Sequence, residues 1–464
     1  MRFIVDNKII VESPTEELIE WCENNLVLDN PDFYKKQRMG LWTGNIQKQF
    51  KLYENIGNSI MIPYGCISEL YKKYAKHYMF YSKIKPPTYV GYHSGINLYQ
   101  YQEKAVTAAL RASHGVIVMP CGAGKTQTAL EIVSRLGMRC LWLTHTQDLM
   151  YQSFDRARTV LGIEKESYGQ ITGGKVNIGR GITFATVQTM AKLDLPLYKN
   201  MFDIVIVDEC HKAVGSPTKV MQFYKVLSNL SCKYKFGITA TPRRADGLEK
   251  AMFALIGNVI CDVDKNTVRD TTCPVNVRMY ETAYKPDLHV VLSGDGTLNY
   301  AALVDDMVGN QDRFDFISDV IVGHRKRGAM LVLANRVDYL KRLNAKYPGK
   351  SICLSGLRNT KVGKAERKEA LKKLNNGDID CIFATYQLAK EGLDVPNLRT
   401  LIMATPEKDE TTVTQAAGRV GRKADGKDNG LIIDLLDDFG MYNGWYKKRM
   451  RYYSKLGYNI LTEM

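Results

Sequence analysis

The sequence predicts an α/β protein with two parallel-sheet domains in tandem, preceded by a small α+β domain. The chain has 464 residues, which is enough for two or three domains. Short apolar, strand-like runs alternate with helical patterns twice along the chain, and this alternation is typical of a parallel sheet covered by helices. The N-terminal part lacks that alternation. We therefore expect domains at residues 1–92, 93–272 and 273–464.

The N-terminal segment carries no nucleotide motif. Arg2–Val11 alternates like one strand, and Thr15–Asn25 has the pattern of an amphipathic helix. From Asn30 to Tyr81 the chain is rich in Tyr, Phe, Lys and Arg. Such residues can hold phosphates and stack on bases, or they can build a small core, and the sequence leaves both interpretations open. Pro86-Pro87 predicts a linker to the next domain.

The second domain begins with the strongest local signal in the chain. An apolar run at Val116–Met119 predicts a buried strand, and a helical pattern starts at Gln127. A glycine loop joins them, made of Gly122, Ala123, Gly124, Lys125 and Thr126. Pro120 takes the place of the first glycine of the full motif, one residue off the strict spacing. The N–H groups of such a loop and the dipole of the following helix converge on phosphate. Lys125 can reach the β- and γ-phosphates of a nucleotide, and Thr126 can place a hydroxyl on Mg²⁺. An ordinary turn is the competing interpretation, and the flanking strand and helix disfavour it.

Two carboxylates follow another strand-like run in this domain. Ile204–Val207 leads directly into Asp208 and Glu209. A carboxylate at a strand end beside a phosphate loop suits Mg²⁺, so we expect Asp208 to be the metal ligand. Glu209 is then placed to orient or deprotonate the attacking water. We do not expect His211 to bind a metal, because no second His or Cys stands at ligand spacing.

These two motifs resemble those of superfamily 2 helicases and translocases. GAGKT at 122–126 and DECH at 208–211 stand in that family's order. The further matching segments are Tyr101-Gln102, Thr144–Thr146, Gly173-Gly174, Thr186–Thr189, Thr239–Pro242, Ala384-Thr385 with Glu391–Pro396, and Gln415–Arg422. The stretch 243–257 resembles the XPB-like and UvsW-like branch, most closely the phage branch-migration helicases. Ala245 departs from that pattern, because XPB proteins carry glutamate there.

The resemblance implies two RecA-like domains that use ATP and Mg²⁺ to unwind or branch-migrate forked and junction DNA. It implies that Gln102 reads adenine, that Asp394 holds the ribose, and that Gln415 belongs to the nucleotide site. Arg419 and Arg422 would supply positive charge to the phosphoryl-transfer transition state. Small strand-end residues would let backbone N–H groups approach the nucleic-acid backbone, and those implied are Thr144, Gly174, Thr189 and Thr385.

Composition limits the possible binding partners and the cellular location. A net charge of +15 and a pI near 9.1 fit a polyanionic partner or a merely soluble basic surface. No apolar run approaches the roughly 20 residues of a membrane span, and the charged start is not a secretory signal. The ten cysteines form no C-x-x-C pair, so reduced thiols are expected. We expect a cytoplasmic monomer, in the host cytoplasm if phage-encoded, with forked or branched DNA, duplex and single-stranded, as partner and no membrane.

Two questions stay open in the sequence. The tail from Trp445 to Lys455 is basic and aromatic, which suits either a helix with a nucleic-acid face or a solvated charged helix. The alternative functions are an RNA-dependent ATPase or RNA helicase, and the motor subunit of a restriction or transcription-repair complex.

Overall fold

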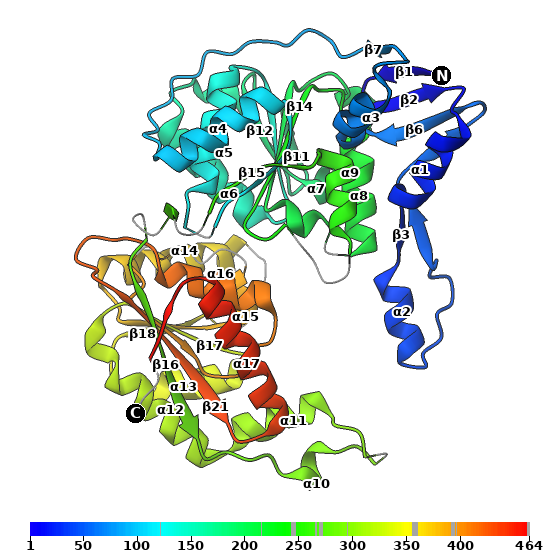
Figure 1. Ribbon diagram of the computed structural model, residues 1–464. Helices are drawn as coiled ribbons and strands as arrows, with labels where there is room; N and C mark the ends of the chain where they lie inside the picture. The colour runs from blue at the N-terminus through cyan, green and yellow to red at the C-terminus, as the bar shows by residue number, and fades with distance from the viewer. Residues whose placement is uncertain are drawn as a thin grey trace. The chain divides into compact units, whose positions relative to one another are not determined.

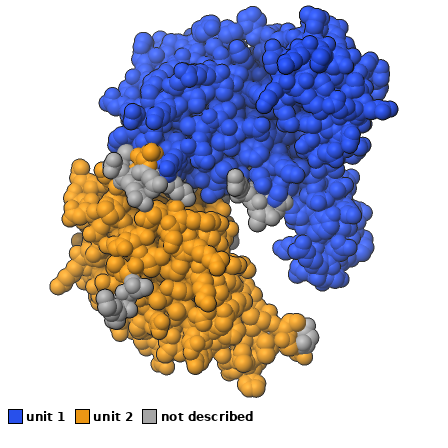
Figure 2. Space-filling view, in the orientation of Figure 1, with its two compact units in different colours: residues 1–120, 124–264 blue, residues 121–123, 265–464 orange. Residues whose placement is uncertain are grey.

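The structure is a computed structural model that forms two compact units. It describes residues 1–120, 122–214, 216–242, 247–264, 267–268, 272–294, 296–354, 361–390, 395 and 397–461. Unit 1 comprises residues 1–120 and 124–264, and unit 2 comprises residues 121–123 and 265–464 (Figure 2). Each unit is organised around its own parallel sheet with flanking helices (Figure 1). The three-part division at residues 92 and 272 stays a prediction.

The main sheet of unit 1 has eight strands in the order β11-β10-β12-β9-β13-β14-β8-β15. The strands are β8 (His114–Val118), β9 (Cys140–Thr144), β10 (Tyr168–Thr172), β11 (Lys175–Asn177), β12 (Ile182–Thr186), β13 (Ile204–Asp208), β14 (Tyr234–Thr239) and β15 (Val259–Asp262). Every pairing is parallel except that of β10 with β11. Parallel strands end at the same edge, so the loops after β8, β13, β9 and β12 all open on one edge of this sheet.

Helices flank the sheet of unit 1, and capping side chains explain where two of them begin. The helices are α4 (Gln100–Ala112), α5 (Lys125–Leu136), α6 (Gln147–Val160), α7 (Val187–Met190), α8 (Pro217–Leu227) and α9 (Glu249–Ile256). The hydroxyl of Thr146 accepts the Leu149 N–H at the start of α6. Ser216 caps α8 in the same way, with Pro217 in the first helical position. Both helices therefore start at residues that satisfy an exposed backbone N–H.

The N-terminal segment forms a second, five-stranded sheet in unit 1, in the order β5-β6-β2-β1-β7. Its elements are β1 (Arg2–Val5), β2 (Lys8–Glu12), α1 (Glu16–Leu26), β5 (Glu54–Ile56), β6 (Ser59–Pro63), α3 (Ile67–Tyr74) and β7 (Phe80–Ser82). The prediction of one strand over Arg2–Val11 is wrong, because the chain reverses at Asp6-Asn7 and β1 pairs antiparallel with β2. Asp and Asn favour turns, and Asp6 is held there by Lys199 at 2.7 Å and by the Ser231 hydroxyl.

An arm projects from this segment and is built from β3 (Val27–Asp29), α2 (Pro31–Arg38) and β4 (Gln49–Lys51) (Figure 1). We call residues 27–51 the arm. Strands β3 and β4 pair antiparallel at its base, where Leu28 and Phe50 are buried. Helix α2 has no buried residue. The arm therefore has an anchored base and an exposed outer part.

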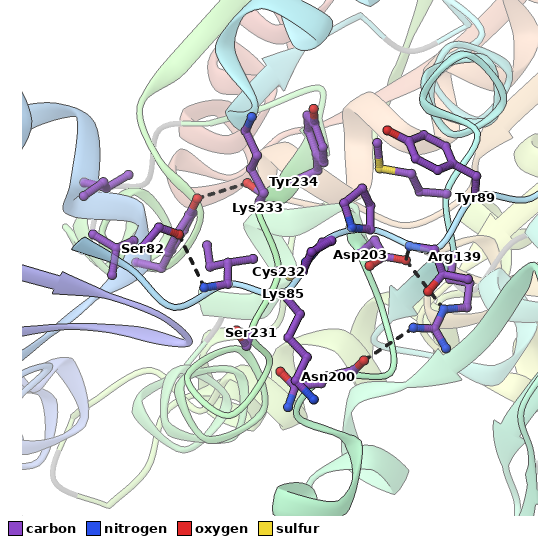
Figure 3. A pocket seen from close by; sticks show the side chains of 18 of the residues that line it. Ser82, Lys85, Tyr89, Arg139, Asn200, Asp203, Ser231, Cys232, Lys233 and Tyr234 are labelled. Atoms are coloured by element: carbon purple, nitrogen blue, oxygen red, sulfur yellow. Dashed lines mark hydrogen bonds and ion pairs between the residues drawn. The ribbon is translucent and has the colours of Figure 1, made fainter. Parts of the chain in front are cut away.

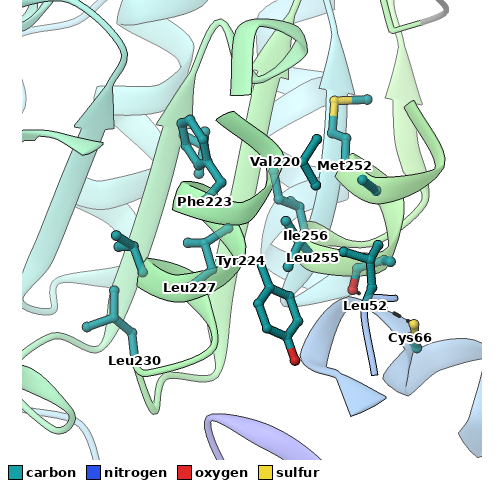
Figure 4. Packing of buried hydrophobic residues seen from close by; sticks show 14 of the residues in the cluster. Leu52, Cys66, Val220, Phe223, Tyr224, Leu227, Leu230, Met252, Leu255 and Ile256 are labelled. Carbon is teal, nitrogen blue, oxygen red and sulfur yellow. Dashed lines mark hydrogen bonds between the residues drawn. The ribbon is translucent and has the colours of Figure 1, made fainter. Parts of the chain in front are cut away.

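The N-terminal segment shares a hydrophobic core with helices α8 and α9. Leu52 and Cys66 belong to the same buried cluster as Tyr224 and Leu255 (Figure 4). The Tyr224 hydroxyl also donates to Glu54 at 2.6 Å. Part of the aromatic content that the sequence left open is thus structural, since Phe3, Tyr53 and Tyr74 lie in this core.

Residues 83–99 connect the N-terminal segment to α4 and run along the amino ends of the sheet strands. The Thr88 N–H donates to the Asp203 carboxylate at 3.1 Å, and Asp203 also pairs with Arg139 at 3.5 Å. A cavity of about 850 Å³ lies beside this connection, with Ser82, Lys85 and Tyr234 in its lining (Figure 3). It lies where β9, β13 and β14 begin, which is the edge opposite the glycine loop.

Unit 2 contains a seven-stranded sheet in the order β18-β19-β17-β20-β21-β16-β22, parallel at every pairing between its named strands. The strands are β16 (Val275–Thr282), β17 (Met330–Ala334), β18 (Ser351–Leu354), β19 (Cys381–Thr385), β20 (Thr400–Met403), β21 (Gly430–Asp437) and β22 (Asn459–Leu461). The helices are α10 (Leu288–Val291), α11 (Tyr300–Gly309), α12 (Gln311–Gly323), α13 (Val337–Lys346), α14 (Lys361–Asn376), α15 (Tyr386–Lys390), α16 (Glu410–Val420) and α17 (Gly440–Lys455).

The basic, aromatic tail forms α17, and one of its faces belongs to the core of unit 2. Arg449 is 1% exposed and pairs with the Asp434 carboxylate on β21 through both Nε and Nη2, at 2.8 Å each. The Tyr453 hydroxyl donates to the same carboxylate at 2.9 Å. Burial opposes the charged form of Arg449, yet Asp434 outweighs it and raises the pKa of the guanidinium. Neither sequence interpretation foresaw this internal ion pair, while Lys447 and Lys448 stay exposed on the other face.

Arg449→Ala is expected to destabilise unit 2 by about 3 kcal/mol, because it leaves the Asp434 carboxylate buried without its partner. Lys448→Ala removes an exposed cation from the same helix and is expected to cost about 0.5 kcal/mol or less. Urea unfolding followed by tryptophan fluorescence measures both. Equal midpoints for the two variants would show that the ion pair does not stabilise the fold.

Two global properties complete the description. Among the described residues, no helix is both long enough and apolar enough to cross a bilayer. Nine cysteines lie in the described part of the chain, and none of the nine forms a disulfide bond.

Candidate nucleotide and nucleic-acid site

The glycine loop after β8 adopts a backbone that requires glycine. Gly122 and Gly124 have φ angles of +84° and +77°, a region that other residues rarely adopt. A Cβ at Gly124 would lie 2.3 Å from the Gln102 Nε2 atom. The Gly124 carbonyl accepts the first hydrogen bonds of α5, from the N–H and the hydroxyl of Thr128 at 3.0 and 3.2 Å. The loop therefore leads straight into the N-terminus of α5, which presents N–H groups and a positive dipole end.

Gln102 is packed against this loop. It is 1% exposed, and its Oε1 atom accepts the Tyr99 N–H at 2.9 Å at the start of α4. The ring of Tyr99, which is 54% exposed, stacks on that of Tyr101 with 5.7 Å between centroids. The structure thus places Gln102 beside the phosphate loop, and its role in reading adenine remains a prediction.

The two carboxylates after β13 face the loop. The Lys125 Nζ atom lies 3.4 Å from the Glu209 carboxylate, with both side chains largely buried. Glu209 has a φ of +49°, which is unusual for a residue with a side chain and aims its carboxylate at the loop. Asp208 accepts a hydrogen bond from the Ser153 hydroxyl on α6 at 3.2 Å. Lys125, Asp208 and Glu209, which the sequence predicted as catalytic, are thus brought together.

The surroundings push the pKa values of these carboxyl groups apart. Burial and the adjacent Glu209 raise the pKa of Asp208 above its ordinary value. Burial also acts on Glu209, but Lys125, His211 and Lys212 outweigh it and lower the pKa of that carboxyl. Glu209 is therefore held ionised, which a group that accepts a proton or orients water requires. A divalent cation beside Asp208 would reverse the direction of its shift.

The residues around the glycine loop are suited to hold Mg²⁺ and a nucleoside triphosphate. Mg²⁺ is usually held by one or two carboxylates together with a hydroxyl and substrate phosphates, rather than by a cage of protein ligands. Asp208 and Thr126 supply such a set, and the described residues contain no cluster of three or more His, Cys, Asp or Glu suited to a metal. The Glu209 Oε2 atom is buried without a hydrogen-bond partner among the described residues, although His211 lies 3.3 Å away. A buried acceptor in that state calls for a donor, and a water molecule can supply one.

His211 has a structural task that the sequence did not reveal. Its Nδ1 atom lies 2.8 Å from the Thr239 hydroxyl at the end of β14. That hydroxyl also accepts the Thr241 N–H at 3.1 Å. The carboxylate motif after β13 is therefore hydrogen-bonded to the threonine motif of the neighbouring strand. Ser153 was also missed, because only the tertiary fold brings α6 to Asp208.

Gly124→Ala is expected to weaken ATP binding at least tenfold, because the new methyl group meets Gln102 in a backbone region that alanine avoids. Gly137→Ala is the matched control at the other end of α5. Its φ is +65°, but a Cβ there would meet nothing closer than 3.6 Å. Binding of a fluorescent ATP analogue should be lost in the first variant and kept in the second. Equal binding by both variants would contradict the role of the Gly124 loop.

The residues predicted to contact nucleic acid in unit 1 follow neighbouring strands along the same edge. Thr144 ends β9, Thr189 lies on α7 directly after β12, and Gly174 lies in the turn after β10. The order β10-β12-β9-β13 puts these loops in a row next to the carboxylates. Gly174 has a φ of +81° and open space beside it, and Thr189 shares a 2.9 Å hydrogen bond with Thr186. The Thr144 side chain is fully buried and its hydroxyl donates to the Thr146 carbonyl, so its contribution would come through the backbone.

In unit 2, helix α16 carries Gln415 and Arg419, and Arg422 follows its end. Arg419 is 8% exposed and its Nη2 atom donates to the Ala389 carbonyl. Arg422 is half-buried, and its carbonyl is held by Lys427 at 2.8 Å. Arg419 is therefore held against α15, and the roles of both arginines at the phosphates remain predictions.

Two further residues of the predicted site, Thr385 and Asp394, belong to the sequence of unit 2. Thr385 ends β19, and its hydroxyl accepts the Leu388 N–H at 3.4 Å. Asp394, predicted to hold the ribose, lies outside the described residues, as do Glu391–Leu393.

Two family models match most of the motif-bearing sequence. "Type III restriction enzyme, res subunit" matches residues 95–244, and "Helicase conserved C-terminal domain" matches residues 312–424. The putative ATP-dependent RNA helicase L396 of Acanthamoeba polyphaga mimivirus is 28% identical over 430 residues, which cover 89% of this chain and 77% of that protein. The DNA 3'-5' translocase XPB2 of Sulfurisphaera tokodaii is 27% identical over 74% of this chain and 82% of its own length.

The fold also matches solved structures. S. cerevisiae Dbp5 bound to RNA and ADP BeF3 superposes with a TM-score of 0.57 at 16% identity, over 79% of this chain and 90% of that chain. With the two family models, this likeness confirms the prediction of two RecA-like domains in tandem.

Proposed function

Since this chain belongs to helicase superfamily 2 and is an ATP-hydrolysing enzyme, we propose that it is a motor for forked and junction DNA. In this proposal it unwinds or branch-migrates such DNA in replication, recombination or repair. One observation supports a coupling between ATP hydrolysis and nucleic-acid binding. Strand β13, which ends at Asp208 and leads into Glu209, is the direct neighbour of β9, where the row of predicted nucleic-acid loops on the same sheet edge begins.

The ATP chemistry follows from the residues around the loop. Mg²⁺, held by Thr126 and Asp208, would neutralise charge on the phosphates. Lys125 keeps Glu209 ionised in the absence of nucleotide, and its ammonium group is then available to a γ-phosphate. Glu209 orients the attacking water and accepts its proton. Ser153 fixes the orientation of Asp208.

DNA is favoured over RNA as the substrate. The net charge of +15 supports a polyanionic partner of either kind. The motif pattern resembles the XPB-like branch, and the archaeal relative is named as a DNA translocase. RNA is the second candidate, because the mimivirus relative is named as a putative RNA helicase.

ATPase stimulation separates these candidates. Steady-state hydrolysis is measured with single-stranded DNA, forked DNA, a four-way junction and RNA of matched length. We expect DNA to raise kcat at least tenfold more than RNA does. Stimulation by RNA alone would replace the DNA proposal with the RNA one.

A further inference from the structure

A groove of about 830 Å³ lies between the arm and helices α7 and α8 of unit 1. Its polar lining residues are the amides Asn30, Asn45, Gln47, Gln188 and Gln222, the hydroxyl residue Thr218, and the cations Lys192 and Lys225. The Lys225 ammonium also donates to the Ala191 carbonyl at 2.8 Å. No acidic residue is among the described residues that line it. A groove with amide and ammonium donors and no carboxylate is chemically suited to phosphate oxygens.

The groove continues the row of nucleic-acid loops. Gln188 and Lys192 flank Thr189, which the sequence predicted to contact the nucleic-acid backbone. The Gln188 side chain donates to the His145 carbonyl at 2.9 Å, so this wall is tied to the loop after β9. Lys192 is exposed. The groove therefore adjoins the loops after β9 and β12.

The other wall is the arm, which exposes three large apolar side chains just after the polar helix α2. Trp42 is 83% exposed, and its neighbours Met39 and Leu41 are 62% and 52% exposed. The nearby groove wall is held firmly, because the buried Asn30 donates from its side chain to the Gln47 carbonyl at 2.9 Å. Trp42 stands three residues before Asn45, which lines the groove. An exposed aromatic ring close in the chain to a basic groove wall is suited to base stacking.

We propose that this groove binds one backbone of branched DNA as it leaves the loop row of unit 1, and that Trp42 stacks on the bases at the branch point. The proposal rests on the proposed function and gives it a specific contact for branched substrates. Lys192 and the amides hold phosphates, which fix position but carry no sequence information. Trp42 reports unpaired bases, because a ring can stack only where the duplex has opened.

Point variants test this better than removal of the N-terminal segment, because that segment shares a core with α8 and α9. Lys192→Glu reverses charge in the groove, and Trp42→Ala removes the exposed ring. Lys104→Glu is the matched control, since Lys104 is an exposed lysine on α4, which packs against β8 and β15 at the other end of the sheet. Trp42→Phe keeps an aromatic ring at the same position.

The measurement is the Kd of the full-length protein for a DNA fork and for a linear single strand, by fluorescence anisotropy at 50 to 200 mM salt. The fork carries 2-aminopurine at its first unpaired base. We expect Lys192→Glu to weaken fork binding about tenfold more than linear binding and to reduce the salt slope by about one or two. Trp42→Ala should weaken fork binding about tenfold and abolish the 2-aminopurine quenching, which Trp42→Phe should largely keep.

The other possible outcomes would contradict either the groove proposal or the proposed function. A wild type that prefers forks, with variants that keep the same fork-to-linear ratio, would overturn the groove proposal and leave the proposed function standing. Equal losses on fork and linear strands would also overturn it. A wild type without fork preference would contradict the proposed function itself.

Discussion

Glu209→Gln is expected to lower kcat for ATP hydrolysis by about 10³-fold while ATP still binds. The reason is the position of the carboxylate, 3.4 Å from Lys125 and held ionised by it. Glutamine has nearly the same size and keeps the loop contact, but it cannot accept a proton from water. Lys125→Ala should differ, because it removes a cation that holds phosphates and therefore weakens binding as well.

The measurement is single-turnover ATP hydrolysis beside equilibrium binding of a slowly hydrolysed analogue, both with DNA present. Glu17→Gln is the control, since it also removes a carboxylate paired with a lysine, Lys73 at 2.6 Å, but in the N-terminal segment. Its kcat should stay within twofold of the wild type. Near-normal hydrolysis by Glu209→Gln would show that another group handles the water.

Arg422→Ala is expected to lower kcat by about 10³-fold and to leave the KM for ATP nearly unchanged. An arginine finger acts on charge that develops in the transition state, so its loss should not affect ground-state binding. Arg422 is half-buried, with its carbonyl fixed by Lys427, whereas Arg419 is buried against the Ala389 carbonyl. Arg419→Ala should accordingly lower the stability of unit 2 as well as kcat.

DNA-stimulated ATPase kinetics measure this split. Lys423→Ala removes the adjacent exposed cation and should change neither parameter more than twofold. A large rise in KM at unchanged kcat for Arg422→Ala would identify Arg422 as a ground-state phosphate ligand instead.

The interior strands could be predicted from sequence because burial on both faces makes them continuous apolar runs. The apolar runs Val116–Met119 and Ile204–Val207 predicted two strands that the structure contains as β8 and β13, with bounds that differ by one or two residues. The outer strands β15 and β22 were missed because they are not buried on both faces. Their residues are exposed or half-exposed, and their apolar runs are only three and two residues long.

The site was predictable where one loop carries its chemistry, and less so where the fold assembles it. The strand–loop–helix context identified Lys125 and Thr126, and the strand end identified Asp208 and Glu209. The contacts of Ser153 with Asp208 and of His211 with Thr239 join segments 55 and 28 residues apart, so no local pattern contains them.

Composition was least informative about which residues of the basic and aromatic segments are buried. Arg449 and the exposed Lys448 stand one residue apart, yet one is an internal ion-pair partner and the other faces solvent. Likewise Tyr74 is buried in the N-terminal core, while Trp42 on the arm is exposed. Composition gives the chemistry available in such a segment, and only packing decides which residues remain free to use it.

The most direct test of a DNA motor is strand separation by the full-length protein. A forked DNA duplex, a linear duplex with one overhang and an RNA fork of the same sequence are incubated with ATP and Mg²⁺, and the released strand is measured over time. We expect ATP-dependent strand release that is fastest on the DNA fork and absent with the Glu209→Gln variant. Equal release from the linear duplex, or release from the RNA fork alone, would contradict it.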